Sequence, residues 1–138
     1  MKLNKPIISI EDDEDDQKFI AMALKELRVP NPLYFFSDGL AALPYLEAMT
    51  EQPFLILCDI NMPLMNGMEL RDHINRRVTL KKKCIPFVYL TVLSGVDIVQ
   101  RAYEQNTQGF YQKANSYAGL LGQIRLLITL SDELSSSR

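Results

Sequence analysis

The chain has 138 residues, of which 47% are hydrophobic and 23% are charged, as is typical of a single soluble globular domain. Its net charge of −2 provides no electrostatic argument for nucleic-acid binding. Two cysteines are too few for a disulfide framework, no apolar run is long enough to span a membrane, and the N-terminus lacks the apolar core of a signal peptide. We therefore expect a cytoplasmic protein that binds neither nucleic acid nor membrane.

Short apolar runs alternate with helical patterns along the chain. In chain order, the runs predicted to be strands are Ile7–Ile10, Leu33–Phe36, Phe54–Asp59, Pro86–Thr91 and Gly109–Lys113. Apolar residues at helical spacing predict helices around Phe19–Leu27, Leu40–Met49, Met68–Arg76, Val96–Asn106 and Tyr117–Ile128. Pro44 is expected to shorten or shift the start of the second helix. The Ser-rich residues 131–138 are expected to fray.

The predicted strands are nearly continuous in apolar residues rather than alternating with polar ones. This pattern is typical of a parallel sheet that helices cover on both faces. Five strands in alternation with five helices therefore predict a doubly wound α/β fold with a five-stranded parallel sheet. Ligands of such sheets bind at the carboxyl ends of the strands, where the winding reverses.

Polar residues follow the ends of these strands. Glu11 and Asp12 come after the first strand, Asp59 ends the third, Thr91 ends the fourth, and Lys113 ends the fifth. If these strands are neighbours, the side chains converge on one edge of the sheet. Clustered carboxylates repel one another and favour a bound cation, and a set of oxygen ligands suits Mg²⁺ or Mn²⁺. Because a carboxylate beside such a metal can attack phosphorus, the set predicts phosphoryl transfer.

Four motifs carry a resemblance to a known family. In this order and spacing, the sequence closely resembles the receiver domain of two-component response regulators through IISIEDDE, LILCDINMPLMNG, PFVYLTVLSG and GFYQKA. The resemblance runs from Ile7 to about Leu130 and implies the flavodoxin-like (βα)5 fold with strand order 2-1-3-4-5. We expect residues 1–130 to form the receiver domain, residues 131–138 to form a short tail, and the chain to act without an attached output domain.

The resemblance also implies a phosphoacceptor and a metal site. Asp59 takes the position of the phosphoacceptor. Asp12, Asp59 and the backbone carbonyl of Asn61 would ligate Mg²⁺, with Mn²⁺ as a possible substitute. Glu11 would act through a metal-bound water. The donor would be a phosphohistidine on a histidine kinase or on a histidine phosphotransfer protein.

Three further residues have implied roles in the switch. Thr91 would bond the phosphoryl group, and Lys113 would pair with the acceptor carboxylate and then with the phosphate. Phe110 matches the switch aromatic, which turns inward when the threonine is drawn to the phosphoryl oxygen. Phosphorylation would then shift the population of two arrangements of one surface, formed by Val96–Asn106, Gly109–Lys113 and the last helix. A downstream protein would bind that surface.

Three positions depart from the family pattern. Glu11 replaces the commoner Asp, which adds one methylene group. Val92 stands where the family has a small residue, and with Asn61 and Leu93 it lies at positions that tune the site; we expect it to slow phosphorylation by small-molecule donors. Ala114 replaces a proline that usually follows a cis bond. Because a cis bond before Ala costs roughly 3 kcal/mol, we predict a trans bond there.

Two other functions stay open, and part of the acidic segment has a purely structural interpretation. The departures leave room for a degenerate receiver that only binds a partner. A small Mg²⁺-dependent phosphatase of the haloacid dehalogenase type would also use a strand-end Asp, but it requires a second Asp where this chain has Asn61. Otherwise we expect no enzyme activity beyond slow self-dephosphorylation. Asp13 to Asp16 are interpreted mainly as the acidic first turn of a helix.

The last predicted helix has more apolar residues than one buried face requires. Leu126 and Leu130 lie outside its core stripe, and Tyr103, Tyr111 and Tyr117 are expected near it. This surplus predicts a surface for a partner or for a homodimer.

Overall fold

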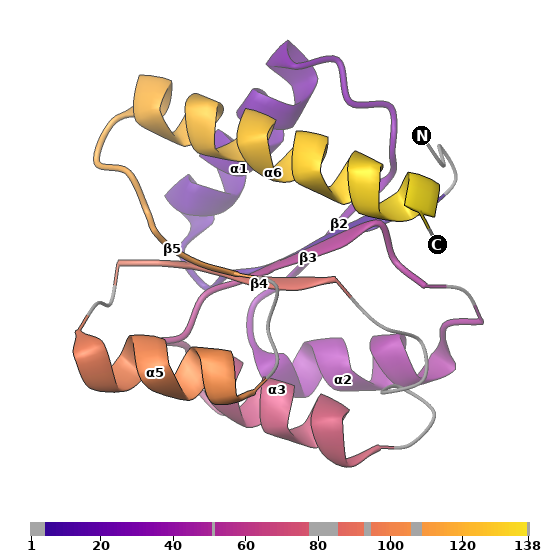
Figure 1. Cartoon of the computed structure of the whole chain (residues 1–138), viewed down its shortest axis with the longest axis vertical. Helices are drawn as coiled ribbons and strands as arrows, with labels where there is room; N and C mark the ends of the chain where they lie inside the picture. The colour runs from indigo at the N-terminus through magenta and orange to yellow at the C-terminus, as the bar shows by residue number, and fades with distance from the viewer. Residues whose placement is uncertain (1–4, 51, 78–85, 93–94, 106–108, 138) are drawn as a thin grey trace.

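A five-stranded parallel sheet lies between two layers of helices in the computed structural model, which describes residues 5–50, 52–77, 86–92, 95–105 and 109–137 (Figure 1). In their order across the sheet, the strands are β2 (Leu33–Phe36), β1 (Ile7–Ile10), β3 (Leu55–Cys58), β4 (Phe87–Thr91) and β5 (Gly109–Gln112). The helices are α1 (Glu14–Glu26), α2 (Gly39–Ala48), α3 (Gly67–Arg76), α5 (Val96–Glu104) and α6 (Tyr117–Ser137). The predicted doubly wound fold and its strand order are confirmed.

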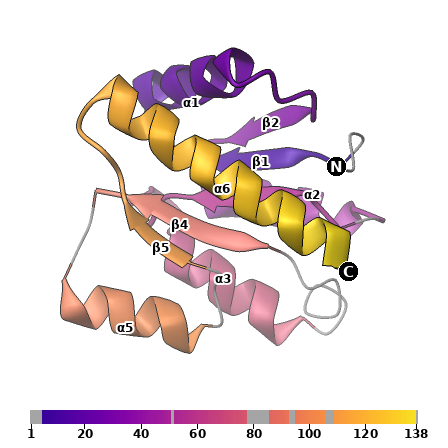
Figure 2. The ribbon, with the colours of Figure 1, turned by 45° about the horizontal axis from the view of Figure 1, so that its top comes forward.

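The two helical layers explain why the strands are apolar throughout. Helices α1 and α6 cover one face of the sheet, whereas α2, α3 and α5 cover the other (Figure 2). Because successive side chains of a strand point to opposite faces, Leu57 and Val88 join the core beneath α1 and α6. Their neighbours Ile56 and Tyr89 join the core on the side of α2 and α3. Both faces of the central strands therefore need apolar residues.

Two expectations about helix ends are wrong. Asp38 caps α2 by accepting a hydrogen bond from the Ala41 amide at 2.9 Å, so the helix begins at Gly39 and Pro44 lies inside it. At the other end of the chain, α6 continues to Ser137 instead of fraying after residue 130. Ser131 is buried on the same face of α6 as Ile124, so packing against the core extends beyond the apolar stripe. Among the described residues, no helix is long and apolar enough to cross a bilayer.

The surplus apolar residues do not gather on one surface. Leu126 and Leu130 of α6 are substantially exposed. Tyr111 and Tyr117 pack partly against the core beneath α6, but Tyr103 belongs to α5 on the opposite layer of the molecule (Figure 2). The homodimer therefore stays a prediction that rests on α6 alone.

A buried polar network ties the end of α5 to α3 and β4. The Tyr89 hydroxyl donates to the Gln105 side-chain oxygen at 2.6 Å, and the Gln105 amide donates to Asp72 at 2.7 Å. Arg71 and Asn75 donate to the Gln105 backbone carbonyl at 3.2 and 2.9 Å. We call these five residues the Gln105 network.

The register of the strands brings polar residues together at one edge. Ile10 lies opposite Cys58, so the next residues of β1 and β3, Glu11 and Asp59, are neighbours. The Asp59 amide donates to the Ile10 carbonyl at 2.9 Å, which extends the ladder by one residue. The chain leaves β1 toward β2 on one side and then crosses back to β3 on the other side of β1. The winding therefore reverses between β1 and β3, which is where such sheets bind ligands.

Candidate functional site

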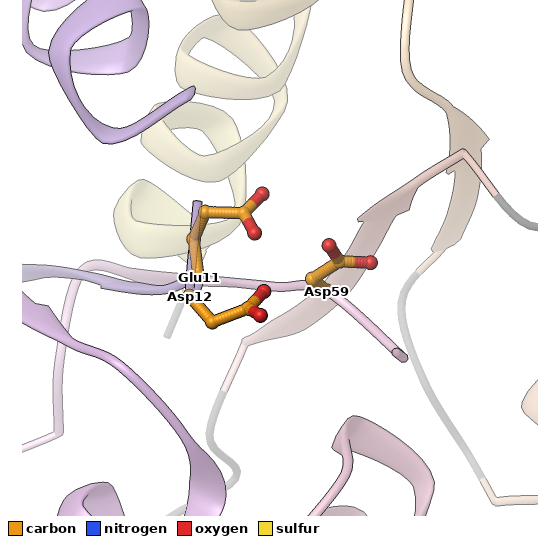
Figure 3. Close-up of side chains that lie close together, drawn as sticks. All are labelled: Glu11, Asp12 and Asp59. Atoms are coloured by element: carbon orange, nitrogen blue, oxygen red, sulfur yellow. The ribbon is translucent and has the colours of Figure 1, made fainter. Parts of the chain in front are cut away.

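Three carboxylates face one another at the carboxyl ends of β1 and β3. One oxygen from each of Glu11, Asp12 and Asp59 lies within 4.8 Å of the others, and Figure 3 shows the Glu11 and Asp12 side chains reaching toward Asp59. Only 2% of Glu11 and 7% of Asp59 are exposed, whereas Asp12 is exposed. They line an open cleft of about 590 Å³. With Thr91 and Lys113, described next, we call these residues the acidic site.

Asp59 is held in place by neighbours from three strand ends. The Thr91 hydroxyl at the end of β4 and the amide of Ile60 donate to its Oδ1 at 2.5 and 2.7 Å. Its Oδ2 lies 3.7 Å from the Lys113 ammonium, which follows β5. One carboxylate oxygen thus accepts two hydrogen bonds, while the other faces a cation at longer range.

Lys113 pairs with three acids, and 7% of its side chain is exposed. Its ammonium donates to Glu11 and to Asp16, the latter at 2.8 Å, in addition to facing Asp59. Burial lowers the pKa of Lys113, but hydrogen bonds to Asp16 and Glu11 and the negative charge of Glu11 and Asp59 outweigh burial and raise the pKa to about 12. Lys113 is therefore a cation at neutral pH.

Glu11 is the buried acid of the cluster. Burial is the main cause that raises its pKa to about 8, and the nearby Asp59 carboxylate raises it further against the hydrogen bond from Lys113. Its other oxygen accepts from the Asp13 amide at 3.3 Å, and its backbone carbonyl accepts from Gln17 at 2.5 Å. Hydrogen bonds to its side chain and to its backbone carbonyl thus hold Glu11 in place at the rim of the cleft.

The donor set fits a hard divalent cation. Its ligand atoms are carboxylate oxygens, two of the three acids are buried, and the exposed Asp12 opens toward the cleft. Mg²⁺ and Mn²⁺ prefer such oxygen ligands, and bound water completes their coordination where the site is open. Lys113 compensates only part of the negative charge of Asp12, Asp16 and Asp59, so a cation would relieve the repulsion that remains.

The other predicted site residues lie around this cluster. Asn61 and Val92 line the cleft, and 62% of Val92 is exposed. Phe110 is half-buried, with its ring centroid 6.2 Å from that of Tyr89. Leu93 lies outside the described residues. The roles predicted for these positions stay predictions.

The bond before Ala114 agrees with the expectation from sequence. The described residues contain no cis peptide bond, so the bond between Lys113 and Ala114 is trans as predicted. The Ala114 amide donates to the side chain of Gln123 on α6 at 3.0 Å. The start of the loop after β5 is therefore anchored to the following helix.

Sequence reasoning missed two residues that support the site. Asp16 is interpreted from the sequence mainly as part of a helix start, yet it contacts Lys113, which lies 97 positions away. Gly67 lies in the LILCDINMPLMNG motif, and a Cβ there would collide with the carbonyl oxygen of Asp59. The Gly67 amide also donates to the Ile60 carbonyl at 3.0 Å, which closes the loop against the end of β3. The Asn-Gly pair in the sequence is the one signal that pointed to a special backbone position here.

Comparisons with known proteins agree with this geometry. The model of a family described as the response regulator receiver domain matches residues 7–125. Response regulator Rcp1 of Synechocystis sp. is 30% identical over 126 residues, which covers 88% of this chain and 84% of Rcp1. The crystal structure of the phosphorylated cyanobacterial phytochrome response regulator RcpA is similar with a TM-score of 0.80 and 27% identity, over 98% of this chain and 96% of RcpA. The Mn²⁺-bound form of Rcp1 has a TM-score of 0.77 and 28% identity, over 91% of each chain.

Proposed function

The chain belongs to the family of response regulator receiver domains, and we propose that it is a signalling switch in which Asp59 accepts a phosphoryl group. One observation carries the proposal. Thr91, Lys113 and the acidic pair that follows β1 all converge on the Asp59 carboxylate, although they come from three strand ends other than that of Asp59. Such a set supplies a nucleophile, donors for phosphoryl oxygens and ligands for a cation, which are the parts that phosphoryl transfer requires.

The metal is proposed to be Mg²⁺. Receiver domains bind a divalent metal, and one similar structure is that of Rcp1 with Mn²⁺. In this chain Asp12 and Asp59 would hold the ion, together with the Asn61 carbonyl, and Glu11 would act through water. When bound, the ion supplies positive charge that stabilises the oxygens of the transferring phosphoryl group.

The transfer step is proposed to run from phosphohistidine to Asp59. An oxygen of the carboxylate attacks phosphorus, the P–N bond of the donor breaks as the P–O bond forms, and the imidazole leaves and takes up a proton. Lys113 pairs with the phosphoryl oxygens because its ammonium already faces Asp59 at 3.7 Å. The Thr91 hydroxyl, now bonded to Asp59, turns to a phosphoryl oxygen.

The output is proposed to be a change in a protein-binding surface. This surface is formed by α5, β5 and α6, which are the fourth helix, the fifth strand and the fifth helix of the alternation. Movement of Thr91 would free space toward which Phe110 turns. A histidine kinase or phosphotransfer protein would act upstream in the cytoplasm, and a downstream protein would bind the altered surface. We expect no turnover of phosphoesters beyond slow loss of the phosphoryl group from Asp59 itself.

The test is formation of a phosphoryl or beryllofluoride adduct. The wild-type chain and Asp59→Asn are incubated with acetyl phosphate and Mg²⁺, and intact mass is followed. We expect a gain of one phosphoryl group in the wild type that needs Mg²⁺ and is absent from Asp59→Asn. In parallel, ¹⁹F NMR should detect bound beryllofluoride with the wild type only.

Each alternative function predicts a different result. A degenerate receiver would form no adduct with either reagent. A phosphatase would release many phosphates per chain from a phosphoester, with Asp59 required for turnover. Either result would contradict the proposed switch.

A further inference from the structure

Lys113 is shared between the acceptor and an acid outside the acidic site. Its ammonium lies 2.8 Å from Asp16 Oδ2 but 3.7 Å from Asp59 Oδ2, and it also donates to Glu11. Asp16 belongs to the first turn of α1, and 31% of its side chain is exposed. Asp16 therefore binds the cation at shorter range than the acceptor carboxylate does.

The position of Asp16 is set independently of Lys113. Asp13 caps α1 and accepts from the amides of Asp15 and Asp16 at 2.9 and 3.1 Å, which fixes the backbone of this turn. The neighbouring Asp15 is exposed, and its side chain is in none of the ion pairs of Lys113. The first turn thus presents one acid toward the ammonium and a second, of equal charge, toward solvent.

We propose that Asp16 is a positioning residue that retains the Lys113 ammonium and so weakens its pairing with the phosphoryl group on Asp59. The inference rests on the proposed function, which it extends to regulation of the lifetime of the phosphorylated state. An ammonium has three donors, and Asp16 and Glu11 occupy two of them. The negative charge of Asp16 also offsets part of the positive charge that the phosphoryl oxygens would otherwise attract.

The test compares Asp16→Asn with the matched variant Asp15→Asn at saturating Mg²⁺. Both substitutions remove one negative charge from the same helical turn. We expect Asp16→Asn to bind beryllofluoride about threefold to tenfold more tightly than the wild type, because the competing, partly exposed ion pair between Asp16 and Lys113 is lost. The lifetime of the phosphoryl group should lengthen by a similar factor. Asp15→Asn should change either quantity by less than about twofold, because exposed charges are screened.

A cycle with Lys113→Met shows whether the effect passes through the lysine. In that background Asp16→Asn should no longer change beryllofluoride affinity. Weaker binding by Asp16→Asn, or an equal gain in Asp15→Asn, overturns the proposal.

A second cycle does not depend on phosphorylation. Urea unfolding without Mg²⁺ or beryllofluoride should show that Asp16→Asn and Lys113→Met are non-additive, because the two side chains form an ion pair. Additive effects would overturn the link between Asp16 and Lys113 even if the wild type forms its adduct. Failure of the wild type to form any adduct would instead overturn the proposed function, and with it the effect on lifetime.

Discussion

Strand β4 contributes to two polar regions that differ in how their charges are balanced. Tyr89 belongs to the Gln105 network, and Thr91, two residues further on, belongs to the acidic site. In the Gln105 network the acid Asp72 is also paired with Arg101 from outside the network, and the amide and hydroxyl groups pair at 2.6 to 2.9 Å. In the acidic site, Glu11 and Asp59 share the ammonium of Lys113 with Asp16, and Asp12 adds a further carboxylate beside them.

The difference shows which region stabilises the fold and which region is suited to bind a cation. A buried polar network whose groups are paired stabilises the structure around it, and removal of one partner leaves the others unsatisfied. A cluster of like charges destabilises the protein until a cation or a positive partner arrives. We expect substitutions in the two regions to have opposite effects on stability, and five predictions test this contrast in order of decreasing effect.

Gly67→Ala should damage both regions at once. The new Cβ would collide with the Asp59 carbonyl, and the Gly67 carbonyl accepts from the Tyr89 hydroxyl at 3.4 Å. We expect a loss of about 3 kcal/mol or more in the free energy of unfolding, because backbone must shift in a packed loop. Urea unfolding and Mg²⁺ titration measure the two effects. As the control, Gly122→Ala places its Cβ in open space and should raise stability by about 0.5–1 kcal/mol; equal stabilities of the two variants would contradict the argument.

Gln105→Leu should damage only the Gln105 network. The substitution removes the 2.6 Å acceptor of the Tyr89 hydroxyl and one donor to Asp72, so we expect the free energy of unfolding to fall by about 2–3 kcal/mol. Mg²⁺ affinity should stay unchanged. Gln100→Leu, at an exposed position of α5, is the matched control and should change stability by less than about 0.5 kcal/mol. A fall in Mg²⁺ affinity in Gln105→Leu alone would show that the two regions are coupled.

The acidic site should bind Mg²⁺ more tightly as pH rises. The pKa of Glu11 is raised to about 8 in the metal-free protein, so below that pH Glu11 holds a proton that the cation must displace. Affinity should rise between pH 6 and pH 8, by at most about tenfold per pH unit for one released proton, and level off above. Calorimetric titration in two buffers of different ionisation heat measures both affinity and proton release.

The same shift predicts the pH dependence of metal-free stability. Because the folded state binds the Glu11 proton more tightly than the unfolded state, stability should fall as pH rises from about 4.5 to about 8. Glu11→Gln, which has no such proton, should lack both effects. A wild-type Mg²⁺ affinity that is flat over this range would contradict the assignment.

Asp12→Asn should have the smallest effect on stability and the opposite sign to Gln105→Leu. It removes one charge from a repelling cluster, so we expect the metal-free protein to gain about 0.5 kcal/mol. The gain in melting temperature that Mg²⁺ produces in the wild type should disappear. Asp15→Asn removes a charge from the favourable end of α1 instead and should lower stability slightly. A less stable metal-free Asp12→Asn would refute the contrast between the regions.

Much of the fold could be predicted from the sequence, because the patterns that indicate strands and helices are local. Each predicted strand matches an observed one to within one residue at either end, since buried central strands must be apolar on both faces. The expectation that Pro44 shortens or shifts the start of α2 is wrong, because the cap from Asp38 and tertiary packing outweigh the cost of a proline inside the helix. The sequence wrongly predicts that residues 131–138 fray, because the small polar side chain of Ser131 gives no sign that it packs against the core.

By itself, the sequence determined the alternation of strands and helices, the covered sheet and the acidic residues at the strand ends, since these depend on composition and spacing along the chain. Only the tertiary structure decided which of these groups form ion pairs and hydrogen bonds with one another. The pairing of Lys113 with Asp16, the close approach of Gly67 to Asp59 and the Gln105 network join residues that are distant in the chain. Such contacts depend on register and on helix packing, and hydrogen bonds act only over about 3 Å, so no spacing in the sequence could have specified them.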